Sequence, residues 1–144
     1  MREYITHSVA DTEKIAADFA NELSGNEVLA MFGNLGMGKT AFVRGLAKGF
    51  GNNSEISSPT FAIVHDYGGN PHLYHFDMYR ISTWDDLYST GFFDYLDLGG
   101  VLAVEWSENI ENVLPEGYIR IEFQSGENEN ERKITIFSPG EEGT

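Results

Sequence analysis

Residues 33–40 have the glycines, lysine and threonine of a phosphate-binding loop. Gly33 and Gly38 stand five positions apart and are followed by Lys39 and Thr40. Glycine lacks the Cβ atom that would keep backbone N–H groups away from phosphate oxygens, and lysine adds a compact cation. A threonine hydroxyl at this position is a ligand for Mg²⁺ bridging the outer phosphates. The spacing therefore predicts a site for a nucleoside polyphosphate with Mg²⁺.

The segments on either side have the form that such a loop requires. Residues 28–32 are an unbroken apolar run, typical of a strand buried on both faces of a parallel sheet. Residues 41–48 place apolar side chains at helical spacing and end at the glycines of residues 49–51. We expect the phosphates at the N-terminus of this helix. The residues predicted to contact them are Asn34, Leu35, Gly36, Met37, Gly38, Lys39, Thr40 and Ala41.

A second metal ligand is predicted at Glu105. Residues 101–104 are the other unbroken apolar run, and Glu105 follows them directly. Nucleotide hydrolases place an acidic group at the end of a strand beside the loop, usually Asp. A charge next to four buried residues needs a reason, so Glu105 is expected to hold Mg²⁺ directly or through water. The alternative is a solvated carboxylate at a strand end.

Three further segments contain candidate residues. Alternation in residues 75–80 places His75 and Asp77 on one strand face, where Asp77 could order the attacking water or be part of a satisfied polar edge. Arg80 could neutralise phosphate charge, anchor a partner or form a surface ion pair. Residues 57–61 are either a nucleotide-sensing switch or an ordinary Ser-Pro turn, and Trp106 either stacks near the nucleotide or caps the core. The histidine spacing matches no compact zinc motif.

The remaining elements predict one α/β domain over residues 1–144. A mainly parallel central sheet with antiparallel edge strands would form a P-loop NTPase-like three-layer sandwich. The expected elements are a helix from a capping box at residues 8–11 to Gly25, a hairpin of strands 61–67 and 72–78, a helix at 83–91, an antiparallel pair at 119–123 and 134–136, and a frayed tail at 138–144.

Composition limits the partners and the compartment. Nine basic and twenty-three acidic residues give a net charge of −14, so direct nucleic-acid binding is not expected. This acidity serves either solubility or docking on a basic partner. The chain has no cysteine, which excludes disulfides and thiolate metal sites, and no apolar segment of membrane-spanning length. We expect a cytoplasmic protein that does not enter the membrane.

Several of these segments together resemble the bacterial TsaE family, small ATPases required for making threonylcarbamoyladenosine beside the tRNA anticodon. The loop, Ser-Pro-Thr-Phe at 58–61, His-x-Asp-x-Tyr-Arg at 75–80 and Glu-Trp at 105–106 occur in the family's order and spacing. The resemblance covers nearly the whole chain, and the last three segments are more specific than the loop. Asn34 and Met37 stand where the family usually has Asp and Ala; both positions contribute mainly backbone, so nucleotide binding is expected to survive.

The resemblance implies that the chain binds a TsaD–TsaB pair and that its ATP hydrolysis keeps this transferase turning over. Lys39 would contact the outer phosphates, Thr40 and Glu105 would hold Mg²⁺, and Asp77 would support hydrolysis. Catalytic roles are thus expected of Lys39, Asp77 and Glu105. Other residues expected near the nucleotide are Trp106, Glu108, Val9 at the adenine, and Arg132 at a phosphate or the base.

Two other functions are compatible with the loop. A small-molecule kinase would need an acceptor pocket and an arginine-bearing lid, and no inserted basic segment is present in the sequence. A nucleotide-gated binding module would use ATP only to order residues 57–61 for docking. The low number of basic residues favours slow hydrolysis by the chain alone, with a partner completing the site.

Overall fold

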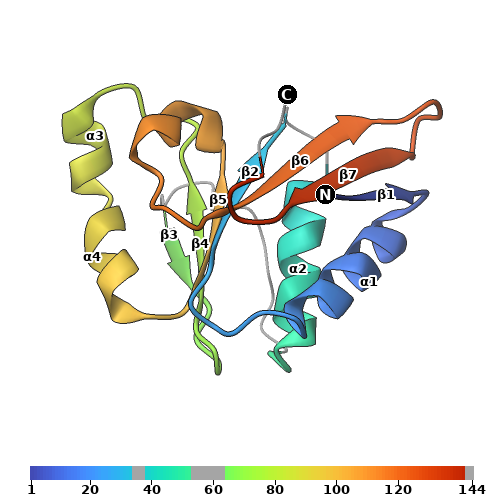
Figure 1. Cartoon of the computed structure of the whole chain (residues 1–144), viewed down its shortest axis with the longest axis horizontal. Coiled ribbons are helices and arrows are strands. Elements are labelled where there is room, and N and C mark those ends of the chain that lie inside the picture. Colours follow the sequence, from blue (N-terminus) through green and yellow to red (C-terminus); the bar gives the residue numbers. More distant parts are fainter. Residues whose placement is uncertain (34–37, 53–63, 142–144) are drawn as a thin grey trace.

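The computed structural model describes residues 1–33, 38–52 and 64–141, in which a seven-stranded sheet separates two layers of helices (Figure 1). The strands lie in the order β1-β7-β6-β2-β5-β4-β3. Their bounds are β1 Arg2–Thr6, β2 Val28–Phe32, β3 Val64–Asp66, β4 Leu73–Asp77, β5 Val101–Glu105, β6 Ile119–Ser125 and β7 Arg132–Phe137. The helical elements are α1 Val9–Ala20, α2 Lys39–Gly49, α3 Trp84–Ser89, α4 Phe92–Leu98 and the 3₁₀ segment η1 Ser107–Val113.

The centre of the sheet is parallel and its margins are antiparallel, as the sequence predicts. The four adjacent strands β6, β2, β5 and β4 run parallel to one another. Strand β3 pairs with β4 in the predicted hairpin, and β7 pairs antiparallel with both β6 and β1. Every residue of β2 and β5 is buried, which explains their unbroken apolar sequences. Because β2 and β5 are adjacent and parallel, their carboxyl ends lie side by side, next to the start of α2.

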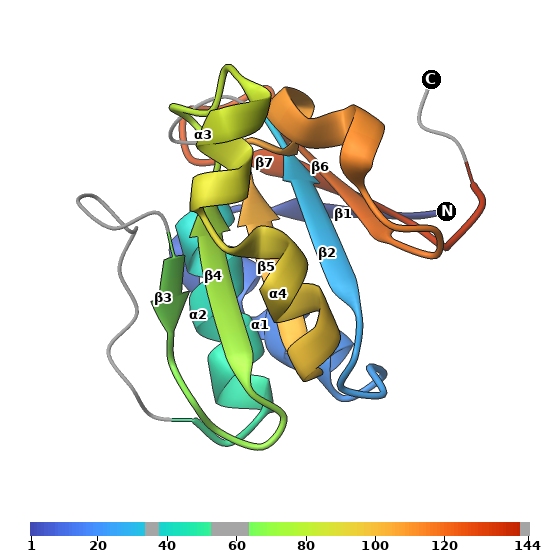
Figure 2. The same ribbon diagram turned by 90° about the vertical axis from the view of Figure 1, so that its left-hand side faces the viewer.

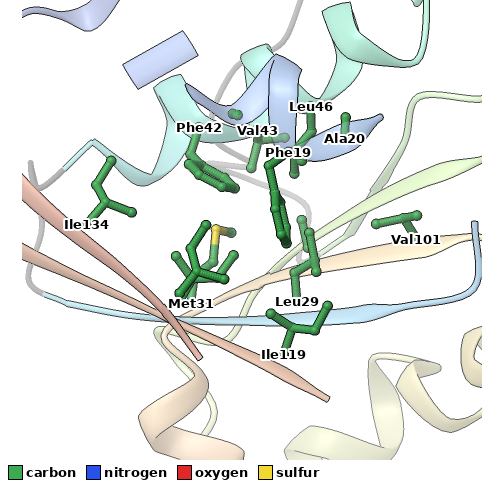
Figure 3. Close-up of a cluster of buried hydrophobic side chains, with 14 of the residues drawn as sticks. Phe19, Ala20, Leu29, Met31, Phe42, Val43, Leu46, Val101, Ile119 and Ile134 are labelled. Carbon is green, nitrogen blue, oxygen red and sulfur yellow. The ribbon is translucent and has the colours of Figure 1, made fainter. Parts of the chain in front are cut away.

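Helices α1 and α2 cover one face of the sheet, and α3, α4 and η1 cover the other (Figures 1 and 2). Phe42, Val43 and Leu46 of α2 are fully buried against the first face, where they meet Phe19 of α1 and Met31 of β2 (Figure 3). A second cluster fills the other face and contains the even-numbered side chains of β4 and β5: Tyr74, Phe76, Leu102 and Val104. The odd-numbered side chains of β4 and β5 thus share a layer with α2.

Three elements were not predicted from the sequence. Strand β1 takes the sheet edge, so the predicted pair β6–β7 lies one position inside it. Helix α4 begins directly after Gly91, whose φ of 77° separates it from α3. The segment η1 follows Trp106.

The predicted start of the first helix is correct, whereas its predicted end is not. Ser8 caps the N-terminus of α1 by accepting the Asp11 N–H at 3.1 Å. The Asp11 carboxylate accepts the N–H of His7 at 3.0 Å. In a capping box it would accept the N–H of the cap residue Ser8 instead. The helix ends at Ala20 and not at Gly25, because the N–H of Asn21 turns back to the carbonyls of Asp18 and Phe19.

Candidate functional site

The phosphate-loop motif connects the end of β2 to the start of α2, as predicted. Gly33 has a φ of 143°, and a Cβ there would lie 2.7 Å from the carbonyl oxygen of Phe123, so only glycine fits. Gly38, with a φ of 95°, forms the N-cap of α2. The predicted contacts Asn34, Leu35, Gly36 and Met37 lie outside the described residues, as do residues 57–61 of the candidate switch.

Lys39 is buried at the N-terminus of α2 and is only 3% exposed. Its Nζ donates a hydrogen bond to the Gly33 carbonyl at 2.7 Å and lies 4.2 Å from the centre of the Trp106 ring. Burial lowers the pKa of Lys39, and the charges of Glu105, Glu108 and Asp77 oppose that shift. The ammonium group thus lies among three acidic residues, held at present by a backbone oxygen and an aromatic face.

Two carboxylates stand side by side at the ends of adjacent strands. Asp77 ends β4 and is the parallel-sheet partner of Glu105, which ends β5. Glu105 is buried and hydrogen-bonds the Nε2 atom of His75, whereas Asp77 is half-buried and accepts the Tyr79 N–H at 2.9 Å. Burial raises the pKa of Asp77; the Tyr79 N–H lowers it, and the neighbouring charge of Glu105 raises it further.

The segment after β5 returns to the loop. Trp106 adopts a left-handed backbone with a φ of 59°, which is strained for a bulky residue. This conformation starts η1, and the Glu108 carboxylate of η1 accepts the Gly33 N–H at 3.1 Å. The Asn109 amide donates to the carbonyls of Met78 at 2.8 Å and Tyr79 at 3.2 Å. The residues after β4 and β5 are therefore tied to each other and to Gly33.

The oxygen groups at this edge fit Mg²⁺. Thr40 lies in the first turn of α2, and Glu105 supplies a buried carboxylate at the adjacent strand end. Among the described residues, no group of three or more His, Cys, Asp or Glu side chains is placed to hold a metal ion. Mg²⁺ commonly binds through one or two protein oxygens together with phosphates and water, so this donor set fits Mg²⁺ shared with a polyphosphate.

A cavity of about 240 Å³ adjoins the start of α2. It brings Val9 and Arg132, far apart in the sequence, to Gly38 and Ala41. The Arg132 guanidinium donates to the backbone carbonyls of Glu129 at 2.8 Å and Glu131 at 2.9 Å. The cavity is lined by His7, Ser8, Val9, Thr12, Gly38, Ala41, Asn130 and Arg132. Val9, expected at the adenine, and Arg132, expected at a phosphate or the base, thus line one hollow beside the loop.

Sequence reasoning missed two contacts of the site. It grouped His75 with Asp77 on one strand face but did not foresee the bond to Glu105, and it did not single out Asn109. Arg80 is exposed at the surface. A larger cavity of about 480 Å³ between α3 and η1 includes Glu108 but no other residue predicted for the site.

Comparisons with known proteins found relatives that match most of the chain. Residues 6–134 match the family model for "Threonylcarbamoyl adenosine biosynthesis protein TsaE". The chain is 35% identical to a tRNA threonylcarbamoyladenosine biosynthesis protein TsaE of Treponema pallidum, over 92% of this chain and 97% of the relative. It is 38% identical to the protein of that name from Aquifex aeolicus, over 95% of this chain and 96% of the relative.

A solved structure has the same fold. The crystal structure of Bacillus subtilis YdiB aligns with a TM-score of 0.77 and 33% identity, over 96% of this chain and 86% of that chain. The predicted α/β class with a mainly parallel central sheet is confirmed. Within the described residues, none of the helices has both the length and the apolar character needed to cross a membrane.

Proposed function

This chain belongs to the TsaE family of threonylcarbamoyladenosine biosynthesis proteins, and on that basis we propose that it is a Mg²⁺-dependent ATPase serving that pathway. Family membership assigns the chain to the formation of threonylcarbamoyladenosine in tRNA. Within that pathway, its role would be to bind and hydrolyse ATP in support of a TsaD–TsaB type complex, which carries out the transfer itself. The observation that carries the proposal is the meeting of Lys39, Asp77 and Glu105 at the start of α2.

Each residue has a role that follows from its position. Lys39 would exchange its bond to the Gly33 carbonyl for the outer phosphate oxygens. Thr40 and Glu105 would hold Mg²⁺, which when bound neutralises charge on the phosphates. Asp77, oriented by the Tyr79 N–H, would position the attacking water. Val9 and Arg132 would border the base in the cavity beside Gly38.

Trp106 and Glu108 would complete the nucleotide site next to Lys39 and Gly33. The Trp106 ring packs against the Lys39 ammonium, and Glu108 fixes the first loop residue through the Gly33 N–H. Of the loop, Asn34, Leu35, Gly36 and Met37 would contribute backbone N–H groups, and Ala41 would line the base cavity.

A partner is proposed to complete the site because positive charge is scarce there. Phosphoryl transfer is accelerated when an arginine stabilises the charge that develops on the phosphate. Arg2, Arg44 and Arg120 pair with acidic residues, and Arg132 donates to backbone carbonyls. Arg80 is exposed three residues beyond Asp77, where it is available to a partner. We therefore expect slow hydrolysis by the chain alone and faster hydrolysis in the complex.

Phosphate release from Mg-ATP, measured for the chain alone and with TsaD and TsaB, tests the proposal. Slow release that rises with the partners is expected, and Lys39→Ala serves as the blank. ATP-dependent binding to TsaD–TsaB without added phosphate release would replace the proposal with a gated binding module. Transfer of the phosphate to an added metabolite would instead identify a kinase, and release from Lys39→Ala at the wild-type rate would exclude this loop as the site.

A further inference from the structure

His75 is completely buried, with an exposure of 0%, and its one hydrogen-bond partner in the described residues is Glu105. The imidazole Nε2 hydrogen-bonds the Glu105 Oε2 atom. Nδ1 has no hydrogen-bond partner within the described part of the chain. On the same sheet face, Leu73 two residues earlier on β4 and Ala103 opposite on β5 are apolar, whereas Asp77 two residues later and His65 opposite on β3 are polar. A histidine here is therefore not explained by packing alone.

The hydrogen-bond partners of the two ring nitrogens indicate which nitrogen of His75 carries the proton. A carboxylate accepts hydrogen bonds, so Nε2 is the protonated nitrogen and donates to Glu105. A buried N–H without an acceptor is costly, so Nδ1 is best left as a bare lone pair. Neutral imidazole with its proton on Nε2 satisfies both conditions. His75 is then a fixed donor aimed at one oxygen of Glu105.

This bond determines what the other groups of the site contact. Lys39 interacts electrostatically with Glu105, yet its Nζ donates to the Gly33 carbonyl at 2.7 Å. A buried carboxylate without His75 would need another donor, and the Lys39 ammonium is a cation that already interacts with it electrostatically. A direct Lys39–Glu105 pair would occupy both the phosphate-binding cation and the proposed metal ligand.

We infer that His75 is a positioning residue, which holds one oxygen of Glu105 so that the other remains directed to Mg²⁺ and Lys39 remains directed to phosphate. The inference rests on the proposed Mg-ATP site. Outer hydrogen bonds of this kind orient metal-binding groups, and their loss typically costs 10- to 100-fold in metal affinity or activity. His75 touches neither phosphate nor metal in this arrangement and acts through Glu105.

The first test detects the His75–Glu105 hydrogen bond in the protein without nucleotide or metal. Long-range ¹H–¹⁵N spectra of the histidine rings, assigned with His75→Gln, should show His75 as the neutral Nε2–H tautomer with a slowly exchanging proton. A proton on Nδ1 would overturn the inference. This measurement is independent of ATP binding, so it stands or fails separately from the proposed function.

The second test measures metal binding. Mn²⁺ is titrated by electron paramagnetic resonance into the protein saturated with a non-hydrolysable ATP analogue. His75→Leu should weaken Mn²⁺ binding by about 10-fold or more. His75→Gln, whose amide N–H₂ reaches the position of Nε2, should remain within about threefold of wild type. Affinity for the analogue without metal should change little in both variants. Equal losses in the Leu and Gln variants, or no loss in Leu, would overturn the inference.

Two further variants keep the test decisive. In a Glu105→Gln background, His75→Leu should add less than about twofold, because the two side chains act as one unit; a full additional loss would contradict positioning through Glu105. If His75→Leu does not fold, His75→Asn replaces it, since its shorter amide does not reach Glu105 and it should bind Mn²⁺ as weakly as expected for Leu. Failure of the wild type to bind Mn²⁺ with the analogue would overturn the proposed site itself, and the inference with it.

Discussion

Burial makes the negative charge of Asp77 unfavourable, so removing this charge should stabilise the fold. The Asp77 carboxylate is half-buried next to Glu105, and its pKa is raised mainly by burial. Asp77→Asn removes the penalised charge and keeps an oxygen that accepts the Tyr79 N–H. We expect a gain of about 1 kcal/mol in the free energy of unfolding at pH 7.5, which is within the range of single stabilising substitutions. Urea unfolding followed by circular dichroism measures it.

The pH dependence of this gain provides the control. A carboxyl group with a raised pKa in the folded state favours folding most when it is protonated. Its contribution is fully present below the unfolded pKa, near 3.8, and is lost as the pH rises through the folded pKa. The advantage of Asp77→Asn should therefore shrink as the pH falls through the folded value and vanish below 3.8. A gain that persists unchanged in acid would contradict the assigned cause.

Trp106 should report the movement of Lys39. The chain has two tryptophans, of which Trp84 is 57% exposed and Trp106 packs against the Lys39 ammonium at 4.2 Å. In Trp84→Phe the remaining emission comes from Trp106. Mg-ATP should draw the ammonium from the ring to the phosphates and produce a saturable change in fluorescence. Lys39→Met in the same background should give no such change. A response of equal size in that variant would show that Trp106 fluorescence does not report the movement of Lys39.

The contact between α1 and α2 depends on glycine. A Cβ on Gly45 would lie 2.2 Å from the Glu13 carbonyl oxygen and 2.6 Å from the Ala16 Cβ. Alanine is the better helix former by about 1 kcal/mol, but the overlap forces α2 away from α1. Gly45→Ala should therefore destabilise the protein by about 2 kcal/mol in urea unfolding. Lys14→Ala, on the exposed face of α1, should stay within about 0.5 kcal/mol of wild type. A Gly45→Ala variant more stable than wild type would show that α2 can move away from α1 at little cost in free energy.

Elements with strong periodicity were predicted from the sequence, and short or polar ones were not. Strands β2 and β5 are buried on both faces, so their sequences are continuously apolar and unmistakable. Strand β1 is mostly exposed at the sheet edge and shows no such pattern. Segment η1 has the polar sequence Ser-Glu-Asn-Ile-Glu-Asn-Val and depends on its contacts with residues after β4. Tertiary contacts decide these elements, and a local pattern does not show them.

The same limit applies to the candidate site. The spacing of Lys39 and Thr40 after two glycines is a local signal, and so is the acidic residue after a buried strand. The His75–Glu105 bond joins residues thirty positions apart and follows from the register of β4 against β5. A pattern in one segment shows which face a side chain occupies, whereas its partner depends on how two strands are aligned.

The cations of the whole molecule are largely neutralised by neighbouring acids. Nine basic residues face twenty-three acidic ones, for a net charge of −14. Five of the nine form ion pairs: Arg2 with Glu22, Arg44 and Lys48 with Glu13, Arg120 with Glu122, and Lys133 with Glu3. A sixth, Lys39, is buried at the start of α2. The described surface therefore offers little unpaired positive charge to a phosphate backbone.

This charge distribution predicts that the chain reaches tRNA only through a partner. Nonspecific binding to nucleic acid comes from cations that release counterions, with dissociation constants of about 10⁻⁴ to 10⁻⁶ M at physiological salt. A protein of net charge −14 should bind tRNA more weakly than about 10⁻⁴ M under these conditions. Fluorescence anisotropy of labelled tRNA measures this for the chain alone and with TsaD and TsaB, with a TsaD–TsaB sample lacking the chain as the reference. Tight binding by the chain alone that weakens steeply with added salt would contradict this prediction, since all nine basic residues lie in the described part of the chain and five of them are already ion-paired.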